Sequence, residues 1–163
     1  MAVKRTKKKV ASKSRPAKKA KAAPAKRRAA GAKTGWKLDS VTPSITANDL
    51  EKSLAWYRDV VGFAVEERWE RDGKLAGVQL RAGSVVFMLG QDDWKKGRDR
   101  KKGEGFRFYV LATGDIDTLA KGIVDRGGTL DQPPTDQEWG MRDFSLTDPD
   151  GFKITIAKET KKR

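Results

Sequence analysis

After Trp36 the chain switches between two hydrophobic patterns, one typical of strands and one typical of helices. In SVTPSITAND (40–49) every second residue is apolar, which predicts a strand with Val41 and Ile45 on one face and Thr42 and Ser44 on the other. In NDLEKSLAWYRDVVG (48–62) the apolar residues recur three and four positions apart, which predicts a helix capped by Asn48 or Asp49 and ended by Gly62. Three further strands are expected in 63–70, 75–83 and 84–91.

The same order of elements then repeats. A strand is expected in 105–112, a helix capped by Asp115 in 114–128, and three more strands in 129–139, 141–148 and 152–159. DLEKSLA at Asp49 and DIDTLA at Asp115 are the visible traces of this duplication. The pattern therefore predicts an α+β fold of two βαβββ modules, at about 38–91 and 105–160.

The segment between the modules, 92–104, is charged and contains two glycines. It is expected to be a solvent-exposed linker. A second contact with nucleic acid is the alternative, because the middle of the segment is basic.

Residues 1–37 differ sharply from the rest in charge. They hold 15 Lys and Arg and no acid, whereas the remainder holds 21 Lys and Arg against 22 acids. Such a segment cannot bury enough apolar surface to order itself, so it is expected to be a disordered tail. Its composition resembles the Lys-Ala-Pro tails of linker histones. We expect it to bind phosphate backbones without sequence preference, through Lys7, Lys8, Lys9, Lys18, Lys19, Lys26, Arg27 and Arg28.

Two other roles for this tail remain open: it keeps the protein in solution, or it contacts RNA or acidic proteins only incidentally. The tail has no apolar run, so neither a secretory signal nor a membrane anchor is expected. The predicted location is the cytoplasm, with association with the nucleoid as the alternative.

The chain contains no Cys and no His. This excludes disulfides, thiolate metal sites, cysteine nucleophiles and every mechanism that uses an imidazole. Any chemistry must use carboxylates, amines, guanidinium groups, hydroxyls or phenols.

The helix DLEKSLAWYRDVVGF (49–63) and the hairpin WGMRDFSLTDPDGFKITI (139–156) carry a family resemblance. Together with the duplication, they resemble the vicinal oxygen chelate superfamily of glyoxalase I, extradiol dioxygenases, and fosfomycin- and bleomycin-resistance proteins. The resemblance covers about 38–160. It implies that each module curls into a partial barrel and that paired modules form a cleft.

The resemblance also implies four positions for metal ligands. They fall at Thr42, near Met88, near Phe108 and at Thr155, four residues after the Gly of the D-P-D-G turn. None of these side chains is a strong ligand for a divalent metal. The chain therefore resembles the metal-free, bleomycin-resistance-like branch, and neither a metal nor another cofactor is expected.

Small-molecule binding in the cleft is the predicted function, and no catalytic residue is assigned. Aromatic side chains suit stacking on a planar ligand, although most of them also suit a core. Arg142 could anchor an anion, but a salt bridge to a neighbouring Asp is the favoured alternative. The residues expected to line the cleft are Thr42, Ser44, Trp69, Met88, Phe108, Trp139, Arg142 and Thr155.

The leading hypothesis is thus a homodimeric protein that sequesters a small aromatic molecule. A superfamily enzyme that acts without metal, or with unusual oxygen ligands, is the first alternative, and Tyr109 and Glu138 are its candidates. A nucleoid-associated protein, in which the domain only dimerises the tail, is the second.

Overall fold

The computed structural model describes residues 39–160, which fold as two βαβββ modules. The tail 1–37, with its expected nucleic-acid contacts, lies outside the described residues. The first module consists of β1 (Ser44–Ala47), α1 (Leu50–Ala55), the π-helical turn η1 (Trp56–Val61), β2 (Ala64–Arg71), β3 (Lys74–Ala82) and β4 (Val85–Gln91). The second consists of β5 (Arg107–Leu111), α2 (Ile116–Asp125), β6 (Gln132–Asp136), β7 (Met141–Thr147) and β8 (Lys153–Glu159).

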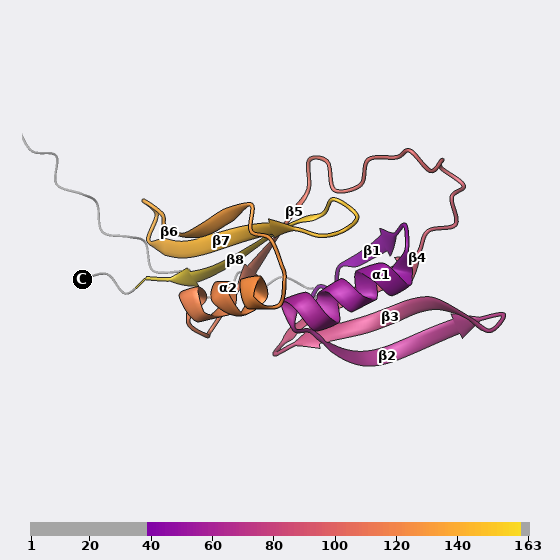
Figure 1. The fold of residues 1–163 in the computed structure, drawn as a ribbon, viewed down its shortest axis with the longest axis horizontal. Coiled ribbons are helices and arrows are strands. Elements are labelled where there is room, and N and C mark those ends of the chain that lie inside the picture. The colour runs from indigo at the N-terminus through magenta and orange to yellow at the C-terminus, as the bar shows by residue number, and fades with distance from the viewer. Residues whose placement is uncertain (1–38, 161–163) are drawn as a thin grey trace, which may run out of the picture. The chain divides into compact units, whose positions relative to one another are not determined.

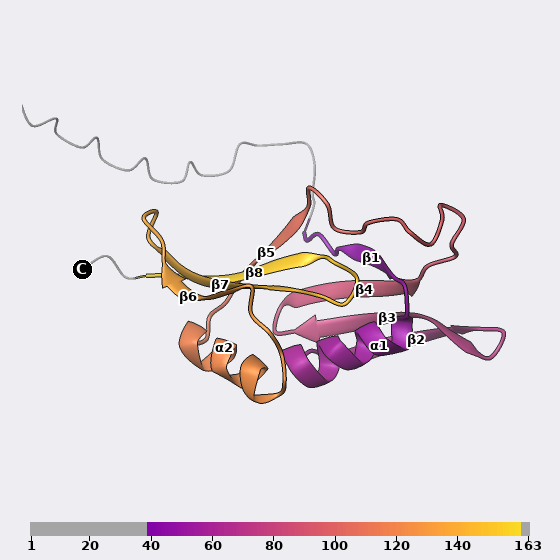
Figure 2. The same cartoon turned by 45° about the horizontal axis from the view of Figure 1, so that its top comes forward.

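Each module forms its own four-stranded sheet. The strand orders are β1-β4-β3-β2 and β5-β8-β7-β6, and only the β1/β4 and β5/β8 pairs are parallel. The helix of each module covers one face of its sheet (Figures 1 and 2). Each sheet therefore has a helix-covered face and a second face, called here the helix-free face. The expected α+β fold with duplicated modules is confirmed.

The helix ends follow the sequence signals. The carboxylate of Asp49 accepts a hydrogen bond from the N–H of Lys52, and that of Asp115 accepts one from Thr118. Each satisfies a backbone donor that the first turn leaves without a helical partner. Gly62 ends the first helical segment in the left-handed conformation (φ 98°), which a glycine adopts without strain.

The two modules share one core, and aromatic rings run across it. Phe63 stacks on Phe87 in the first module, with ring centroids 5.5 Å apart. Phe87 in turn contacts Phe108 of the second module at 4.8 Å. All three rings are buried, so the helix-covered faces of the two modules pack together around them.

The D-P-D-G turn between β7 and β8 fastens the second module to the helix of the first. The hydroxyl of Tyr57 donates to Asp148 Oδ2 at 2.9 Å. Asp150 accepts from the N–H of Asn48 and from the hydroxyl of Ser53, both at 2.6 Å. Because both aspartates are buried, these bonds form away from water. The turn is therefore the polar joint of the domain.

Burial also changes the titration of this joint. It raises the pKa of the Asp148 carboxyl above its usual value, although the N–H groups of Phe152 and Asp150 and the Tyr57 hydroxyl oppose the shift. Burial and the adjacent Asp148 raise the pKa of the Tyr57 phenol. The phenol therefore remains a hydrogen-bond donor at neutral pH.

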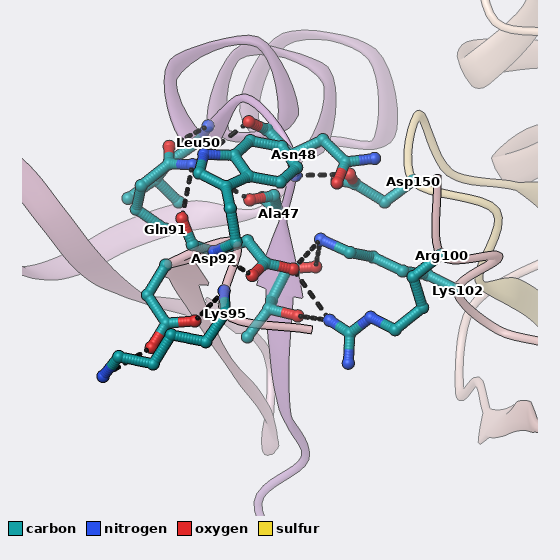
Figure 3. Close-up of polar contacts among 12 residues, drawn as sticks. Ala47, Asn48, Leu50, Gln91, Asp92, Lys95, Arg100, Lys102 and Asp150 are labelled. Carbon is teal, nitrogen blue, oxygen red and sulfur yellow. Dashed lines mark hydrogen bonds and ion pairs between the residues drawn. The ribbon is translucent and has the colours of Figure 1, made fainter. Parts of the chain in front are cut away.

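The segment 92–104 is exposed over most of its length, including 93 and 95–101, and it is anchored near both ends through Asp92 and Lys102. Asp92 Oδ2 lies 2.7 Å from the amine of Lys102 and 2.7 Å from the guanidinium of Arg100 (Figure 3). The Lys102 amine is buried and also donates to the carbonyl of Thr46 in β1. The Lys102 amine, the N–H of Trp94 and the Arg100 guanidinium hold the pKa of Asp92 well below its usual range.

Two details differ from the expected pattern. β1 begins only at Ser44, and Val41, expected to face the helix, is 88% exposed. In α2, the apolar side chains of Leu119 and Val124 are also exposed, whereas Ile116 and Ile123 are buried. Residues 39–160 contain no helix that is both long and apolar enough to cross a membrane.

Replacement of Asp150 by Ala should loosen the joint. The substitution leaves the N–H of Asn48 and the Ser53 hydroxyl without their acceptor, which costs about 2–4 kcal/mol of unfolding free energy. Urea denaturation would measure the loss. Glu138→Ala removes an exposed carboxylate and should change stability by less than about 0.5 kcal/mol. Equal losses in the two variants would show that Asp150 is not a joint residue.

The Asp92 anchor should weaken in acid. A carboxyl whose folded pKa lies below its unfolded value stabilises the fold above the unfolded pKa, about 3.9, and loses this effect as the pH falls. The difference in melting temperature between the wild type and Asp92→Asn should therefore be largest at about pH 5–7 and shrink toward about pH 3. Thermal denaturation across this range tests it, and a difference that does not change with pH would contradict it.

Candidate functional site

The strand register places one row of side chains across the helix-free face of each sheet. In the first sheet Ser44, Met88 and Gln79 are paired across β1, β4 and β3. In the second sheet the equivalent row consists of Tyr109, Thr155 and Ser145 across β5, β8 and β7. Residues paired in register share a face of their sheet, so each row forms a continuous surface. These rows are the centre of the candidate site.

Thr155 is the most unusual member of the rows. Its side chain is only 5% exposed, and its hydroxyl has no hydrogen-bond partner. A buried hydroxyl without a partner destabilises a fold by about 1–3 kcal/mol, which is why such groups are rare. Its neighbour Tyr109 is 50% exposed and presents a phenol beside it. The second row therefore offers an aromatic surface and an unused hydrogen-bonding group.

A buried carboxylate lies on the same face, one alternation along β7. Asp143 is buried, and its Oδ1 accepts hydrogen bonds from Gln137 at 2.8 Å and from Gln132 at 3.3 Å. The hydroxyl of Thr147, on the other side of Ser145, donates to Asp131 at 2.6 Å. Asp143 and Thr147 on this face are thus paired, whereas the buried hydroxyl of Thr155 has no partner.

The helix-free face of the first sheet is held by charge pairs. Glu66 accepts hydrogen bonds from Arg81 and Gln79, both at 2.6 Å, and these donors lower the pKa of its carboxyl. The indole of Trp69 lies directly over Gly77 on the paired strand, where a side chain would collide with it. The expected residue Trp69 therefore lies on this face, beside the pair formed by Glu66 and Arg81.

Ser44, Met88 and Thr155 lie on the helix-free faces, as the sequence pattern predicts; whether they bind a ligand stays a prediction. Thr42 is exposed and precedes β1, so the row position in the first strand belongs to Ser44. Phe108 is paired with Ile154 and is buried in the core, so its place in the row is taken by Tyr109. The sequence left this position uncertain by one residue, because the connection between β5 and α2 is longer than usual.

Two other expected residues lie away from the rows. The guanidinium of Arg142 forms salt bridges with Asp117 at 2.7 Å and with Asp136 at 2.9 Å. A salt bridge was the favoured alternative for this residue. Both acids raise the pKa of Arg142. Trp139 is exposed in the turn between β6 and β7.

Sequence reasoning missed Asp143, Gln132 and Gln137. Strand alternation could have indicated Asp143, because it lies two residues before Ser145 and therefore points to the same face of the sheet. What the pattern could not show is that a carboxylate there is buried and held by two amides.

The donor set of the rows does not resemble a metal centre. Ser44, Met88, Tyr109 and Thr155 contribute hydroxyls, a thioether and a phenol, none of which is a strong ligand for a divalent cation. Within residues 39–160 no three acidic side chains converge in a way that could hold a metal ion. The arrangement is suited to hydrogen bonding and stacking.

Comparisons with known proteins agree with this fold. Residues 37–156 match the model of the Glyoxalase/Bleomycin resistance protein/Dioxygenase superfamily. A member of that superfamily from Sphaerobacter thermophilus is similar in structure, with 27% identity, a TM-score of 0.62, and coverage of 75% of this chain and 98% of the other. TioX from a Micromonospora species has 19% identity and a TM-score of 0.62, with coverage of 74% and 98%.

A superfamily protein from Nocardioides has 17% identity and a TM-score of 0.61, with coverage of 80% of this chain and 89% of the other. A search among curated protein sequences gave no match. Duplicated βαβββ modules, paired sheets and a family model that spans most of the chain lead to one conclusion: this protein belongs to the Glyoxalase/Bleomycin resistance protein/Dioxygenase superfamily.

Proposed function

We propose that the domain binds a small aromatic molecule without a metal ion, as a sequestering protein of the bleomycin-resistance type does. The observation that carries the proposal is the buried, unpartnered hydroxyl of Thr155. A ligand that hydrogen-bonds to this group would remove the penalty that the unpartnered hydroxyl carries.

The surroundings of Thr155 support an aromatic ligand. Half of the Tyr109 surface is exposed beside it, and a ring in that position stacks on planar molecules. The row of the first sheet adds the thioether of Met88, which contacts aromatic groups favourably. No row member is a strong metal ligand, so binding through hydrogen bonds and stacking needs no cofactor.

A homodimer would complete the site. Five open cavities within residues 39–160 have none of Ser44, Met88, Tyr109 and Thr155 in their walls. A ligand is usually enclosed on most of its surface. Leu111, also on the helix-free face of β5, is 65% exposed. A second copy packed against this face would bury Leu111 and enclose the rows.

The basic tail supplies a separate activity in this proposal. Residues 1–37 associate with nucleic acid by releasing counterions from phosphates, in the cytoplasm or at the nucleoid. Small-molecule binding is then the task of the domain alone.

One observation favours a metal-free enzyme as the second candidate. Asp143 is a buried carboxylate on the same face as Thr155, and two amides fix its position. A carboxylate held in this way could accept a proton from a bound molecule. The appearance of product in the presence of a chelator would decide for the enzyme.

The Thr155 hydroxyl should lower the unfolding free energy of the protein, although it contributes to ligand binding. Thr155→Val removes the unpartnered group without changing the shape of the side chain, so we expect unfolding free energy to rise by about 1 kcal/mol. Thr147→Val is the matched control, because its hydroxyl is paired with Asp131 and its loss should lower stability by about 1 kcal/mol. Chemical denaturation of the full chain measures both. A loss of stability in Thr155→Val would show that the hydroxyl is satisfied.

Ligand binding should appear in a thermal-shift screen of the full chain. A ligand at 100 times its Kd stabilises the native state by about 2.7 kcal/mol, which raises the melting temperature by several degrees. We expect a shift with aromatic compounds that a chelator leaves unchanged and that Thr155→Val and Tyr109→Ala reduce. A shift with divalent metal alone would contradict the proposal. If deletion of residues 1–37 removes every phenotype, the tail carries the function instead.

A further inference from the structure

Two cations lie beside Tyr109 and Thr155 without acidic partners. Arg107 and Lys153 are paired across β5 and β8, one alternation before the pair of Tyr109 and Thr155. Both cations are exposed, and neither makes an ion pair with another residue in 39–160. Side chains two residues apart on a strand point to the same face. The four residues therefore form a square on the helix-free face of the second sheet.

The cations also line a cavity of about 470 Å³. Phe106 forms part of its wall and is 53% exposed, held edge-on against Phe108 at 4.9 Å. The approach of the segment 92–104 to the D-P-D-G turn shapes the rest of the wall, because a side chain at Gly103 would collide with the carbonyl of Gly151. The cavity therefore lies where the segment 92–104 meets the D-P-D-G turn.

The charges around the cavity leave the pair available to an anion. Glu104 also lines the cavity, but its carboxylate lies 3.5 Å from the amine of Lys101. Lys102 is neutralised by Asp92 at 2.7 Å. Asp131 accepts a hydrogen bond from the hydroxyl of Thr147, the β7 neighbour of Lys153, and makes no ion pair with Lys153. Arg107 and Lys153 thus remain uncompensated, next to a hydroxyl that lacks a partner.

We infer that the ligand of this domain is an aromatic acid, whose anionic group binds between Arg107 and Lys153 and whose distal polar group binds Thr155. This inference rests on the small-molecule binding proposed above and adds the chemical class of the ligand. The two ends of the square are separated by two residues of extended strand, about 7 Å. A benzene ring with an acidic group and a para hydroxyl spans this distance and places its ring against Tyr109.

Four small-molecule probes and three variants of the full chain, one of them Thr155→Val, test the inference. The probes are 4-hydroxybenzoate, its neutral counterpart 4-hydroxybenzamide, benzoate and inorganic phosphate. The variant Arg107→Gln/Lys153→Gln removes two exposed cations from the square. The control Lys52→Gln/Lys121→Gln removes two exposed cations from the helices, and both variants change the net charge equally. Isothermal titration calorimetry gives each Kd.

The expected pattern is specific to the square. 4-Hydroxybenzoate should bind the wild type and the control variant equally, and should bind Arg107→Gln/Lys153→Gln about tenfold or more weakly. 4-Hydroxybenzamide should bind weakly to all three proteins with similar Kd values. Added salt should weaken the binding of the acid but not of the amide. Loss of the para hydroxyl, in benzoate, should weaken binding to the wild type but not to Thr155→Val.

Other outcomes would overturn the inference. Equal binding of acid and amide would show that the ligand is not recognised by its charge, while small-molecule binding itself would stand. Equal weakening by the two double variants would assign the effect to net charge. If 4-hydroxybenzoate does not bind but neutral compounds stabilise the protein in the thermal-shift screen, the aromatic-acid inference fails and the proposed small-molecule binding stands. Binding of an oligothymidylate through Arg107 and Lys153, without binding of the acid, would make the pair a nucleic-acid contact.

Discussion

The burial of two aspartates between the modules is the constraint on which the rest of the domain depends. Asp148 and Asp150 lie in the turn between β7 and β8, yet their partners Tyr57, Ser53 and Asn48 belong to the helical segment of the first module. A buried carboxylate must be hydrogen-bonded, because its desolvation is otherwise costly. The turn therefore has one position in which its acids are satisfied. That position fixes how the second sheet lies against the first helix.

The joint also explains why the duplication is not symmetric. The turn in the first module that corresponds to the D-P-D-G turn is the short Gly83-Ser84 connection between β3 and β4, which has no acid. Only the second module contains the acidic turn of the joint. The segment 92–104 packs against this turn where Gly103 approaches Gly151. The cavity beside Arg107 and Lys153 exists because these pieces meet there. Scaffold and candidate site are thus built from the same contacts.

The two sheets offer different surfaces to a ligand. On the first, Glu66 and Arg81 neutralise each other, and Trp69 covers Gly77. On the second, the Thr155 hydroxyl lacks a partner, and Arg107 and Lys153 lack acids within the described part of the chain. A buried polar group without a partner marks a place where a fold gives up stability, and two exposed cations without acidic partners beside it can attract an anion. The second sheet is therefore the better supported half of the site.

Much of the fold and part of the site could be predicted from sequence. The alternation of apolar residues, the capping residues Asp49 and Asp115, and the repeated order of elements determined two βαβββ modules, because each of these signals is local. The positions Ser44, Met88 and Thr155 followed from strand parity within one element.

The remaining features depend on contacts between elements far apart in the sequence. Phe108 and Tyr109 differ by one position, and only the pairing of β5 with β8 decides which of them enters the core. The sequence favoured a salt bridge for Arg142, but only the structure shows that its partners are Asp117 and Asp136. The sequence alone determined the elements and the absence of His and Cys. The tertiary structure decided which polar groups are paired, because pairing is a property of distances that no local pattern contains.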